Sequence, residues 1–103
     1  MENQDLRALF GDLDKLRESL VEVEKSLRRG TLTVSSPNNL VSVSINYQQE
    51  LLDIFIDSSL LSPARAGLLK ASVVEAVNEA IRVSRNKMLE ETARAVSAFN
   101  NRG

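Results

Sequence analysis

Residues 40–61 have the sequence LVSVSINYQQELLDIFIDSSLL, and this stretch decides the fold because apolar and polar residues alternate on both sides of a polar centre. A period of two is typical of β-strands that bury one face. The alternation predicts an antiparallel hairpin with six apolar side chains on one face. The predicted pairs on that face are Val41 with Ile56, Val43 with Ile54, and Ile45 with Leu52.

The other face of the predicted hairpin is mostly polar, so the sheet has one buried side and one side toward water. The pairs expected there are Ser42 with Phe55, Ser44 with Asp53, and Asn46 with Leu51. The hairpin closes at Gln48-Gln49, but neither glutamine favours the positive φ that a two-residue turn requires. We therefore expect a four-residue loop, Tyr47 to Glu50.

A third strand, TLTVS, precedes the hairpin at residues 31–35. The turn that follows, residues 36–39, contains proline and two asparagines, which are frequent in turns. The result is a three-stranded antiparallel meander with eight aliphatic side chains on one face, and that face needs a cover. The additional pairs predicted are Val34 with Val41 and Leu32 with Val43.

The segment before the strands carries a leucine stripe at alternating spacings of three and four residues. This heptad pattern predicts a long helix from Asn3 to Arg29, which Gly30 ends. The stripe is narrow, and a narrow stripe favours packing along one partner helix. Its members are Leu6, Leu9, Leu13, Leu16, Leu20, Val23 and Leu27.

A second long helix is expected after the hairpin. Ser62-Pro63 predicts its start, with serine as the N-cap and proline at the first helical position, and the helix should run to about Ala98. Its apolar residues recur near helical spacing, so it is the expected cover for the sheet. These residues are Leu69, Val73, Val77, Ile81 and Met88. Residues 1–103 are therefore predicted to form one α+β domain in the order long helix, β-meander, long helix.

The composition argues against several classes of function. The chain has no histidine and no cysteine, which removes the commonest metal ligands and the usual nucleophile and base pairs of hydrolases. Its four scattered glycines form no phosphate-binding loop, so we expect no cofactor, no small-molecule substrate and no catalysis. The sequence also lacks a membrane span and a signal-peptide pattern, and we expect a soluble intracellular protein without membrane association.

Three segments, together with the order of elements, carry a family resemblance: LVSVSIN at residues 40–46, FIDSSLL at residues 55–61, and the helix that opens at Pro63. With these features the chain resembles the YbaB/EbfC family of bacterial nucleoid-associated proteins. The resemblance implies a homodimer held mainly through the central sheets, with helices projecting like the arms of tweezers. It also implies binding of double-stranded DNA in the cytoplasm, at the nucleoid, with a role in nucleoid organisation or transcription.

The net charge is −1, from 13 basic and 14 acidic residues, so a DNA-binding surface must be local. Basic residues gather at the end of the first helix and on the outer face of the second, although such mixed charge is also typical of a solvated helix face. Phosphate contacts from these residues predict salt-sensitive binding with little sequence selectivity. The candidate DNA-binding residues are Lys25, Arg28, Arg29, Arg82, Arg85 and Arg94.

The candidate dimer interface lies on the sheet, where apolar side chains stand among polar ones on the outer face. Its residues are Leu51, Phe55 and Leu40. An alternative function uses the same features differently. The leucine stripe and the sheet face would then form a protein–protein interaction module, with DNA binding weak or lost.

Overall fold

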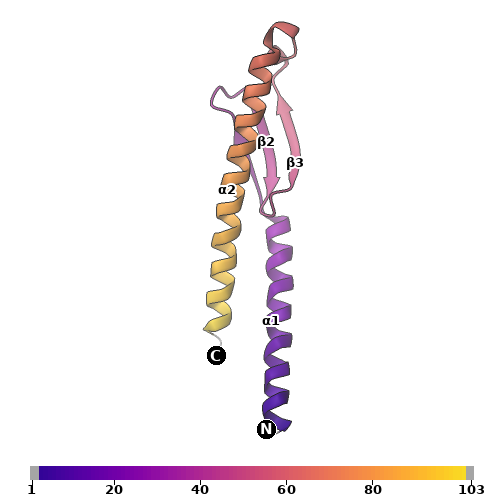
Figure 1. The fold of residues 1–103 in the computed structure, drawn as a ribbon, viewed down its shortest axis with the longest axis vertical. Helices are drawn as coiled ribbons and strands as arrows, with labels where there is room; N and C mark the ends of the chain where they lie inside the picture. The colour runs from indigo at the N-terminus through magenta and orange to yellow at the C-terminus, as the bar shows by residue number, and fades with distance from the viewer. Residues whose placement is uncertain (1–2, 102–103) are drawn as a thin grey trace.

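The computed structural model describes residues 3–101, which form an elongated molecule of about 75 × 18 × 18 Å. The predicted order of a long helix, a three-stranded antiparallel sheet and a second long helix is confirmed (Figure 1). The elements are α1 (Asn3–Arg29), β1 (Thr31–Ser35), β2 (Val41–Asn46), β3 (Leu51–Ile56), the short 3-10 helices η1 (Ser58–Leu60) and η2 (Pro63–Arg65), and α2 (Ala66–Asn100).

Helix α1 ends where the sequence predicts, at Arg29, and Gly30 connects it to β1. Gly30 does not adopt a positive φ, so backbone freedom is not the reason for glycine at this position. A Cβ atom on Gly30 would lie 2.4 Å from Cδ2 of Tyr47, whose ring covers it. The backbone N–H of Tyr47 also donates to the carbonyl oxygens of Leu27 and Gly30, at 3.0 and 3.1 Å. The end of α1 is thereby fastened to the loop that follows β2.

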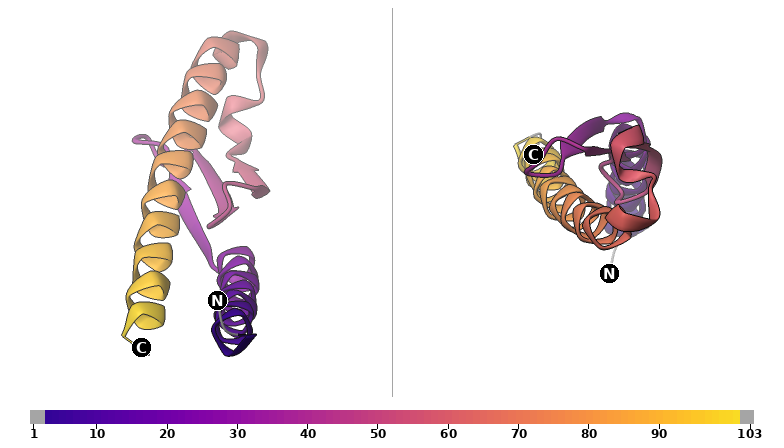
Figure 2. Two further views of the ribbon diagram at one scale, coloured as in Figure 1. Left: turned by 60° about the horizontal axis from the view of Figure 1, so that its bottom comes forward. Right: turned by 90° about the horizontal axis from the view of Figure 1, so that it is seen from above.

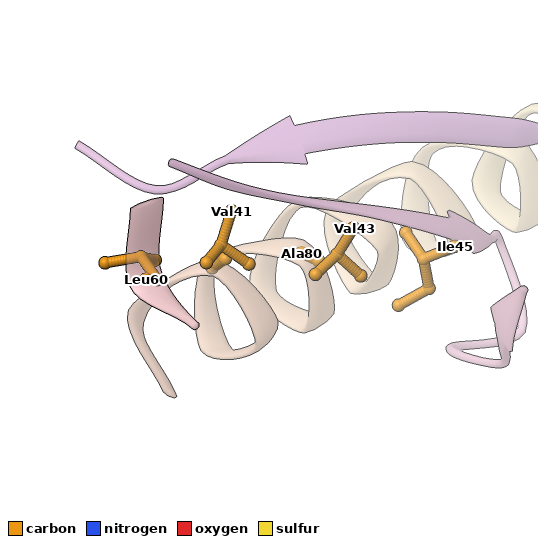
Figure 3. Packing of buried hydrophobic residues seen from close by; sticks show 6 residues of the cluster. Val41, Val43, Ile45, Leu60 and Ala80 are labelled. Carbon is orange, nitrogen blue, oxygen red and sulfur yellow. The ribbon is translucent and has the colours of Figure 1, made fainter. Parts of the chain in front are cut away.

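The core lies between β2 and α2 (Figure 3). Val41, Val43 and Ile45 point from β2 toward α2 and are fully buried, as is Leu60 of η1. Burial of each such aliphatic side chain contributes roughly 1.5–3 kcal/mol before chain entropy is subtracted. The strand order is β1-β2-β3, which places β2 in the middle.

Helix α2 contacts the sheet through small residues spaced four apart, Ser72, Ala76, Ala80 and Ser84, all of which are buried. Small side chains allow the helix backbone to approach the sheet closely. The larger aliphatic residues that the sequence analysis placed at the centre of this contact flank it instead and are half-buried. They are Leu69, Val73, Val77 and Ile81.

The start of α2 differs from the prediction. Pro63 begins the short η2 turn, and the α-helix itself starts at Ala66 and ends at Asn100, two residues beyond the predicted end. Ser62 has the extended backbone of an N-cap, but its side chain forms no capping hydrogen bond. A 3-10 turn often opens a helix in this way, because its tighter bonds satisfy the first backbone groups locally.

The predicted register of β1 on β2 is wrong by two residues. Val34 pairs with Val43 and Leu32 with Ile45. The turn is longer than predicted, because Asn39 adopts a φ of 61° and Leu40 joins the turn. The side chain of Asn38 accepts a hydrogen bond from the Leu40 N–H at 3.1 Å, which stabilises the longer turn. A shift of two residues keeps every side chain on its predicted face.

The predicted register of β2 on β3 is correct at one end and wrong at the other. Ser42 with Phe55, Ser44 with Asp53 and the pairs between them are confirmed, but Ile45 pairs with Leu51 rather than with Leu52. A bulge between Ser44 and Ile45 therefore replaces the last two predicted pairs, and Asn46 does not pair with Leu51.

The bulge follows from the loop, which has the predicted four residues, 47–50. The Asn46 carboxamide oxygen accepts hydrogen bonds from Gln48 N–H and Glu50 N–H, at 2.9 and 3.0 Å, so this side chain organises the turn. Gln49 does adopt a positive φ, 60°, against our expectation for glutamine. Its side chain is held by Tyr47 O and by Ser84 Oγ, at 3.0 and 3.1 Å, which offsets the strained backbone.

Strand β3 is not covered, and this corrects the prediction of a fully buried apolar face. Leu52 and Ile54 remain 54% and 44% exposed. A helix with its side chains is about 10–12 Å wide, whereas neighbouring strands are about 4.8 Å apart, so one helix covers about two strands. Helix α2 lies over β1 and β2, and its second half continues past the sheet alongside α1 (Figures 1 and 2).

Candidate nucleic-acid interface

The three basic residues at the end of α1 are exposed to solvent and partly neutralised by their own helix. Nζ of Lys25 lies 3.8 Å from Oε1 of Glu22, and Nη2 of Arg28 lies 3.0 Å from Oε1 of Glu24. Among residues 3–101, Arg29 forms no ion pair. The position suits cations, because the C-terminal end of a helix carries partial negative charge.

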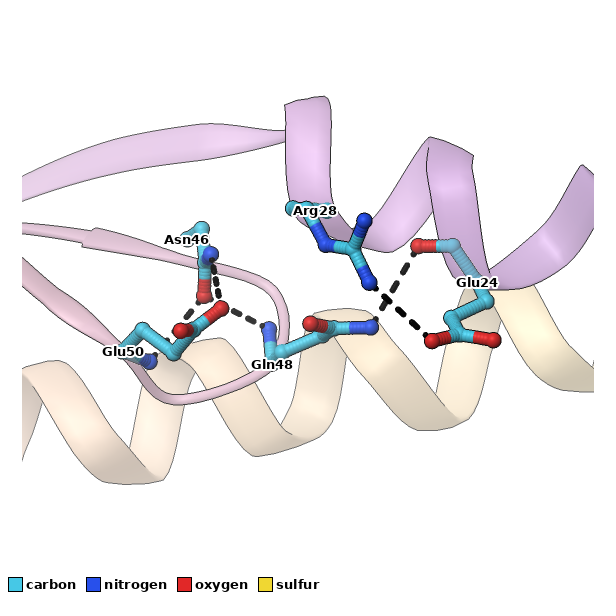
Figure 4. Close-up of polar contacts among 5 residues, drawn as sticks. All are labelled: Glu24, Arg28, Asn46, Gln48 and Glu50. Atoms are coloured by element: carbon cyan, nitrogen blue, oxygen red, sulfur yellow. Dashed lines mark hydrogen bonds and ion pairs between the residues drawn. The ribbon is translucent and has the colours of Figure 1, made fainter.

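The tip of the β2–β3 hairpin lies beside this helix end (Figure 4). The side-chain amide of Gln48 donates to the backbone carbonyl of Glu24 at 3.3 Å, next to the ion pair between Glu24 and Arg28. Gln48 therefore belongs to the same surface. The sequence analysis did not select it, because nothing in its own segment indicates that the hairpin folds back on α1.

Arg82 on α2 is bound to a carboxylate. Its Nε donates to Oε2 of Glu79 at 3.0 Å, and its Nη2 donates to Oε1 of the same residue. The hydrogen bond from Arg82 lowers the pKa of Glu79, and the same bond with Glu79 raises the pKa of Arg82. Both groups are therefore charged at neutral pH. Arg82 also borders a surface depression with Glu75 and Pro37, so its surroundings are acidic.

The remaining two candidates differ from each other. Arg85 is exposed and forms no ion pair within the described part of the chain. Arg94 donates to Oε1 of Glu91 at 3.0 Å. Arg94 also lines a groove between α1 and α2 together with Glu22, which is the ion-pair partner of Lys25.

The structure therefore brings only some of the six basic residues together. Arg94 lines the α1–α2 groove together with Glu22, the ion-pair partner of Lys25, whereas Arg82 borders a different depression next to the β1–β2 turn. Exposed ion pairs of this kind contribute about 0–1 kcal/mol, so a phosphate group can replace the carboxylate at small cost. The arrangement suits weak, salt-dependent contact with a polyanion.

The predicted interface residues lie on and near the edge strand β3. Leu51 and Phe55 are 52% and 59% exposed, whereas Leu40 is half-buried and packs against the core. Leu52 and Ile54 add to the same exposed strand, and the sequence analysis had placed both in the core. An edge strand with unpaired backbone groups and apolar side chains is a template for pairing with another chain.

The outer sheet face itself is polar. The hydroxyl of Thr33 lies 3.2 Å from that of Ser44, and the hydroxyl of Ser35 lies 2.9 Å from that of Ser42. These hydroxyls bond to one another, and the apolar side chain next to them is Phe55 of β3. The apolar surface therefore follows the β3 edge rather than the whole face.

Residues 3–101 contain no group of three or more acidic side chains placed to hold a metal ion. Among the same residues, neither helix is long and apolar enough to cross a membrane.

The model of the YbaB/EbfC DNA-binding family matches residues 1–99. A nucleoid-associated protein of Myxococcus xanthus is 29% identical over 94 residues, which cover 91% of this chain and 90% of that protein. A nucleoid-associated protein of Campylobacter fetus is 30% identical over 87 residues, or 84% of this chain and 79% of that protein. The crystal structure of uncharacterized protein HP0035 from Helicobacter pylori is similar, with a TM-score of 0.66, 29% identity, and coverage of 100% of this chain and 99% of that one.

Proposed function

This chain belongs to the YbaB/EbfC DNA-binding family, and from that membership we propose that it binds double-stranded DNA as a homodimer with little sequence selectivity. The family match over residues 1–99 is the observation that carries the proposal. In this proposal residues 1–103 are one domain that acts at the bacterial nucleoid, in the cytoplasm, in nucleoid organisation or transcription. The relatives from Myxococcus xanthus and Campylobacter fetus, both named nucleoid-associated proteins, support that location.

The exposed edge of β3 supports the homodimer. Antiparallel pairing of two β3 strands would satisfy the free backbone groups of both edges and join two three-stranded sheets into one. It would also remove Leu51 and Phe55 from water, and both are more than half exposed in the single chain. A domain of this size gains stability when it shares apolar surface with a second copy.

The basic residues on the two helices support DNA contact through phosphates. Arg29 and Arg85 have no ion-pair partner among residues 3–101, so they are the side chains most available to a phosphate group. The other four candidates must first leave a carboxylate, which keeps the affinity modest. Phosphate contacts do not discriminate between bases, and their strength falls steeply as salt rises.

The test is binding of the protein to several unrelated duplexes across a salt series, measured by fluorescence anisotropy. One variant combines Arg28→Glu with Arg29→Glu, and a second combines Arg82→Glu with Arg85→Glu. The matched control combines Arg7→Glu with Lys15→Glu, which makes the same change in net charge on α1 away from the proposed site. Circular dichroism checks that each variant is folded.

We expect both site variants to bind several-fold more weakly than the control and to show a shallower salt dependence. Similar losses in all three variants would mean that total charge, and not these positions, determines binding. If the unsubstituted protein fails to bind any duplex at low salt, the DNA function is wrong for this chain.

A second candidate function is a protein–protein interaction module. The observation that favours it is the exposed leucine stripe of α1, of which only Leu27 is buried. The net charge of −1 and the carboxylate partners of the basic residues favour it as well. Strong self-association or capture of a defined protein in the absence of DNA binding would support this alternative.

A further inference from the structure

The loop between β2 and β3 contacts both long helices, and none of the candidate DNA-binding residues belongs to it. On one side it holds the end of α1. The backbone N–H of Tyr47 donates to the carbonyl oxygens of Leu27 and Gly30, and the Tyr47 ring covers Gly30. The side-chain amide of Gln48 donates to the carbonyl oxygen of Glu24 at 3.3 Å, one turn earlier on the same helix (Figure 4). The last turns of α1 are therefore fastened to this loop.

On its other side the same loop is fastened to α2. The side-chain amide of Gln49 donates to Oγ of Ser84 at 3.1 Å, and the Ser84 hydroxyl donates to the carbonyl oxygen of Asn46, just before the loop. Ser84 is fully buried. Gln49 keeps a φ of 60°, which a glutamine rarely adopts without support from its surroundings. The β2–β3 loop is therefore a bridge between α1 and α2.

Away from this loop, α1 and α2 do not pack tightly against each other. Grooves of about 350 and 250 Å³ lie between them. Leu16 and Leu20 of α1 line the second groove, but they remain 38% and 56% exposed. Among residues 3–101, no ion pair joins the two helices. Interdigitated side chains fix the distance between two helices, and this contact has few of them.

The free cations of the two helices are next to the points where the loop is attached. Arg29 precedes Gly30, which the loop covers, and Arg85 follows Ser84, which binds the loop. Within the described part of the chain, these two arginines are the DNA-binding candidates without an ion-pair partner. The loop therefore connects the two backbone segments that carry them.

We propose that the β2–β3 loop is a positioning element for DNA contact. It holds α1 at a fixed distance from α2, so that Arg29 and Arg85 meet phosphate groups with a fixed spacing. Groups held in place bind more tightly than the same groups on a movable arm, because binding then costs less conformational freedom. Tyr47 and Gln48 act through the arginines and not on DNA. This role rests on the proposed DNA function, whereas the spacing of the helices can be measured without DNA.

The first test measures the distance between α1 and α2, without DNA, by double electron–electron resonance. The spin labels are attached to Asp14→Cys on α1 and Ala93→Cys on α2. Both positions are exposed, and the chain has no cysteine of its own. The labelled protein is mixed with an excess of unlabelled protein, so that the measured distances lie within one chain.

The loop variant combines Tyr47→Ala with Gln48→Ala, which removes the ring over Gly30 and a hydrogen bond to α1. The matched control combines Leu61→Ala with Asn86→Ala, which removes a large apolar group and an amide from exposed positions outside the loop. We expect a broader distance distribution in the loop variant and an unchanged one in the control. Equal distributions, with both variants folded by circular dichroism, would overturn the proposal.

The second test measures the affinity for a duplex by fluorescence anisotropy at one low salt concentration. The loop variant retains all six candidate DNA-binding residues, so its charge is unchanged. We expect it to bind several-fold more weakly than the control. Tyr47→Phe with Gln48 intact should restore the affinity, because phenylalanine keeps the ring over Gly30.

A double-mutant cycle shows whether the loop acts through the arginines. In a background of Arg29→Glu and Arg85→Glu, the loop substitutions should cause a much smaller further loss, because effects that share one interaction are not additive. An equal loss in both backgrounds would contradict positioning, as would unchanged affinity in the loop variant.

The two proposals fail in different ways. The DNA function fails if the unsubstituted protein binds no duplex, and the distance measurement then still decides whether the loop fixes α1. The positioning role fails if the unsubstituted protein binds and the loop variant binds equally well. Where the double loop variant does not fold, Gln48→Ala alone takes its place in both tests.

Discussion

Strands β2 and β3 are neighbours of equal length, and β3 is the more apolar of the two, but they have opposite environments. The apolar side chains of β2, Val41, Val43 and Ile45, are fully buried, whereas Ile54 and Phe55 of β3 are 44% and 59% exposed. Hydrophobicity therefore does not explain which strand is covered. Position in the sheet does, because α2 is wide enough for β1 and β2 only.

The two strands also differ in how they are fastened. The end of β2 is tied to α2 through a hydrogen bond from the Ser84 hydroxyl to the carbonyl oxygen of Asn46. The next residue, Tyr47, ties the same end to α1. At the far end of β3, the Asp57 N–H donates to Leu40 O at 2.8 Å, and the Asp57 side chain accepts a hydrogen bond from the Ser59 N–H of η1. Strand β2 is the fixed centre of the molecule, and β3 is the edge that remains available.

The largest effect should come from a pair of matched truncations, Ile45→Ala on β2 and Ile54→Ala on β3. Ile45 is fully buried, so Ile45→Ala should lower the free energy of unfolding by about 2–5 kcal/mol. Ile54→Ala should cost about 1 kcal/mol or less in the dissociated chain, because the side chain is already partly in water. Urea unfolding at several protein concentrations measures both.

The dependence of the two substitutions on protein concentration also distinguishes β2 from β3. If β3 pairs with a second copy, the cost of Ile54→Ala should fall as the protein is diluted, whereas the cost of Ile45→Ala should not change. Equal costs at every concentration would mean that β3 is covered within the single chain.

The next largest loss of stability is expected at the contact between the end of β2 and α1, where the ring of Tyr47 covers Gly30. Gly30→Ala places a methyl group 2.4 Å from the ring of Tyr47, so the ring or the helix must shift, at a cost of about 1–3 kcal/mol. Gly67→Ala is the control, since a Cβ there meets nothing within 4 Å. Thermal unfolding compares the two. Restoration of stability by Tyr47→Ala in the Gly30→Ala background would confirm that the ring is the obstacle.

The anchor between β2 and α2 comes third. Ser84→Ala leaves the buried carbonyl of Asn46 without its hydroxyl donor, and it removes an acceptor from Gln49, which should cost about 1–3 kcal/mol. Ser44→Ala on the same strand is the control, because its hydroxyl lies on the outer face and bonds to Thr33. If Ser84→Ala lowers the free energy of unfolding no more than Ser44→Ala does, the Ser84 hydrogen bonds do not hold β2 in place.

The smallest effect should come from the end of β3. The hydrogen bonds from Ser59 lower the pKa of Asp57, so the carboxylate contributes stability above the ordinary aspartate value of about 3.9. That contribution is lost as pH falls through the lower pKa of the folded chain. Asp57→Asn removes this contribution, so it should slightly lower the stability near pH 7 and flatten the acid side of the stability curve below about pH 4, where the two proteins converge. If the stability of Asp57→Asn falls at low pH as steeply as that of the unsubstituted protein, the Asp57 carboxylate does not make this contribution.

Much of the fold could be predicted because the heptad spacing, the alternation and the turn residues all indicate the same order of elements. The heptad stripe with Gly30 predicted the end of α1 at Arg29, and the strand patterns predicted β1 at residues 31–35 and the loop at residues 47–50, although Leu40 belongs to the turn before β2.

Registers were harder to predict, because Asn39 and Gln49 adopt positive φ values. Both turns are held by contacts distant in sequence: the Gln49 side chain donates to Ser84 of α2, and the side chain of Asn38, next to Asn39, donates to Ser72 of α2.

The candidate DNA-binding residues lie on exposed helix surfaces, and their carboxylate partners are three or four residues away on the same helix, a local spacing that the sequence contains. The position of Arg94 in the groove beside α1, in contrast, depends on how the two helices pack.

By itself, the sequence determined the kind and order of the elements and, up to the bulge in the β2–β3 pairing, the face on which the strand side chains lie, because periods of 3.6 and 2 are properties of the local backbone. Only the tertiary structure decided which apolar residues are covered. One helix spans two strands, and the small residues of α2 bring it over β2 and away from β3. Leu52, Ile54 and the exposed leucines of α1 are as apolar as the core residues, but they remain exposed because residues 3–101 of the single chain contain no further element that covers them.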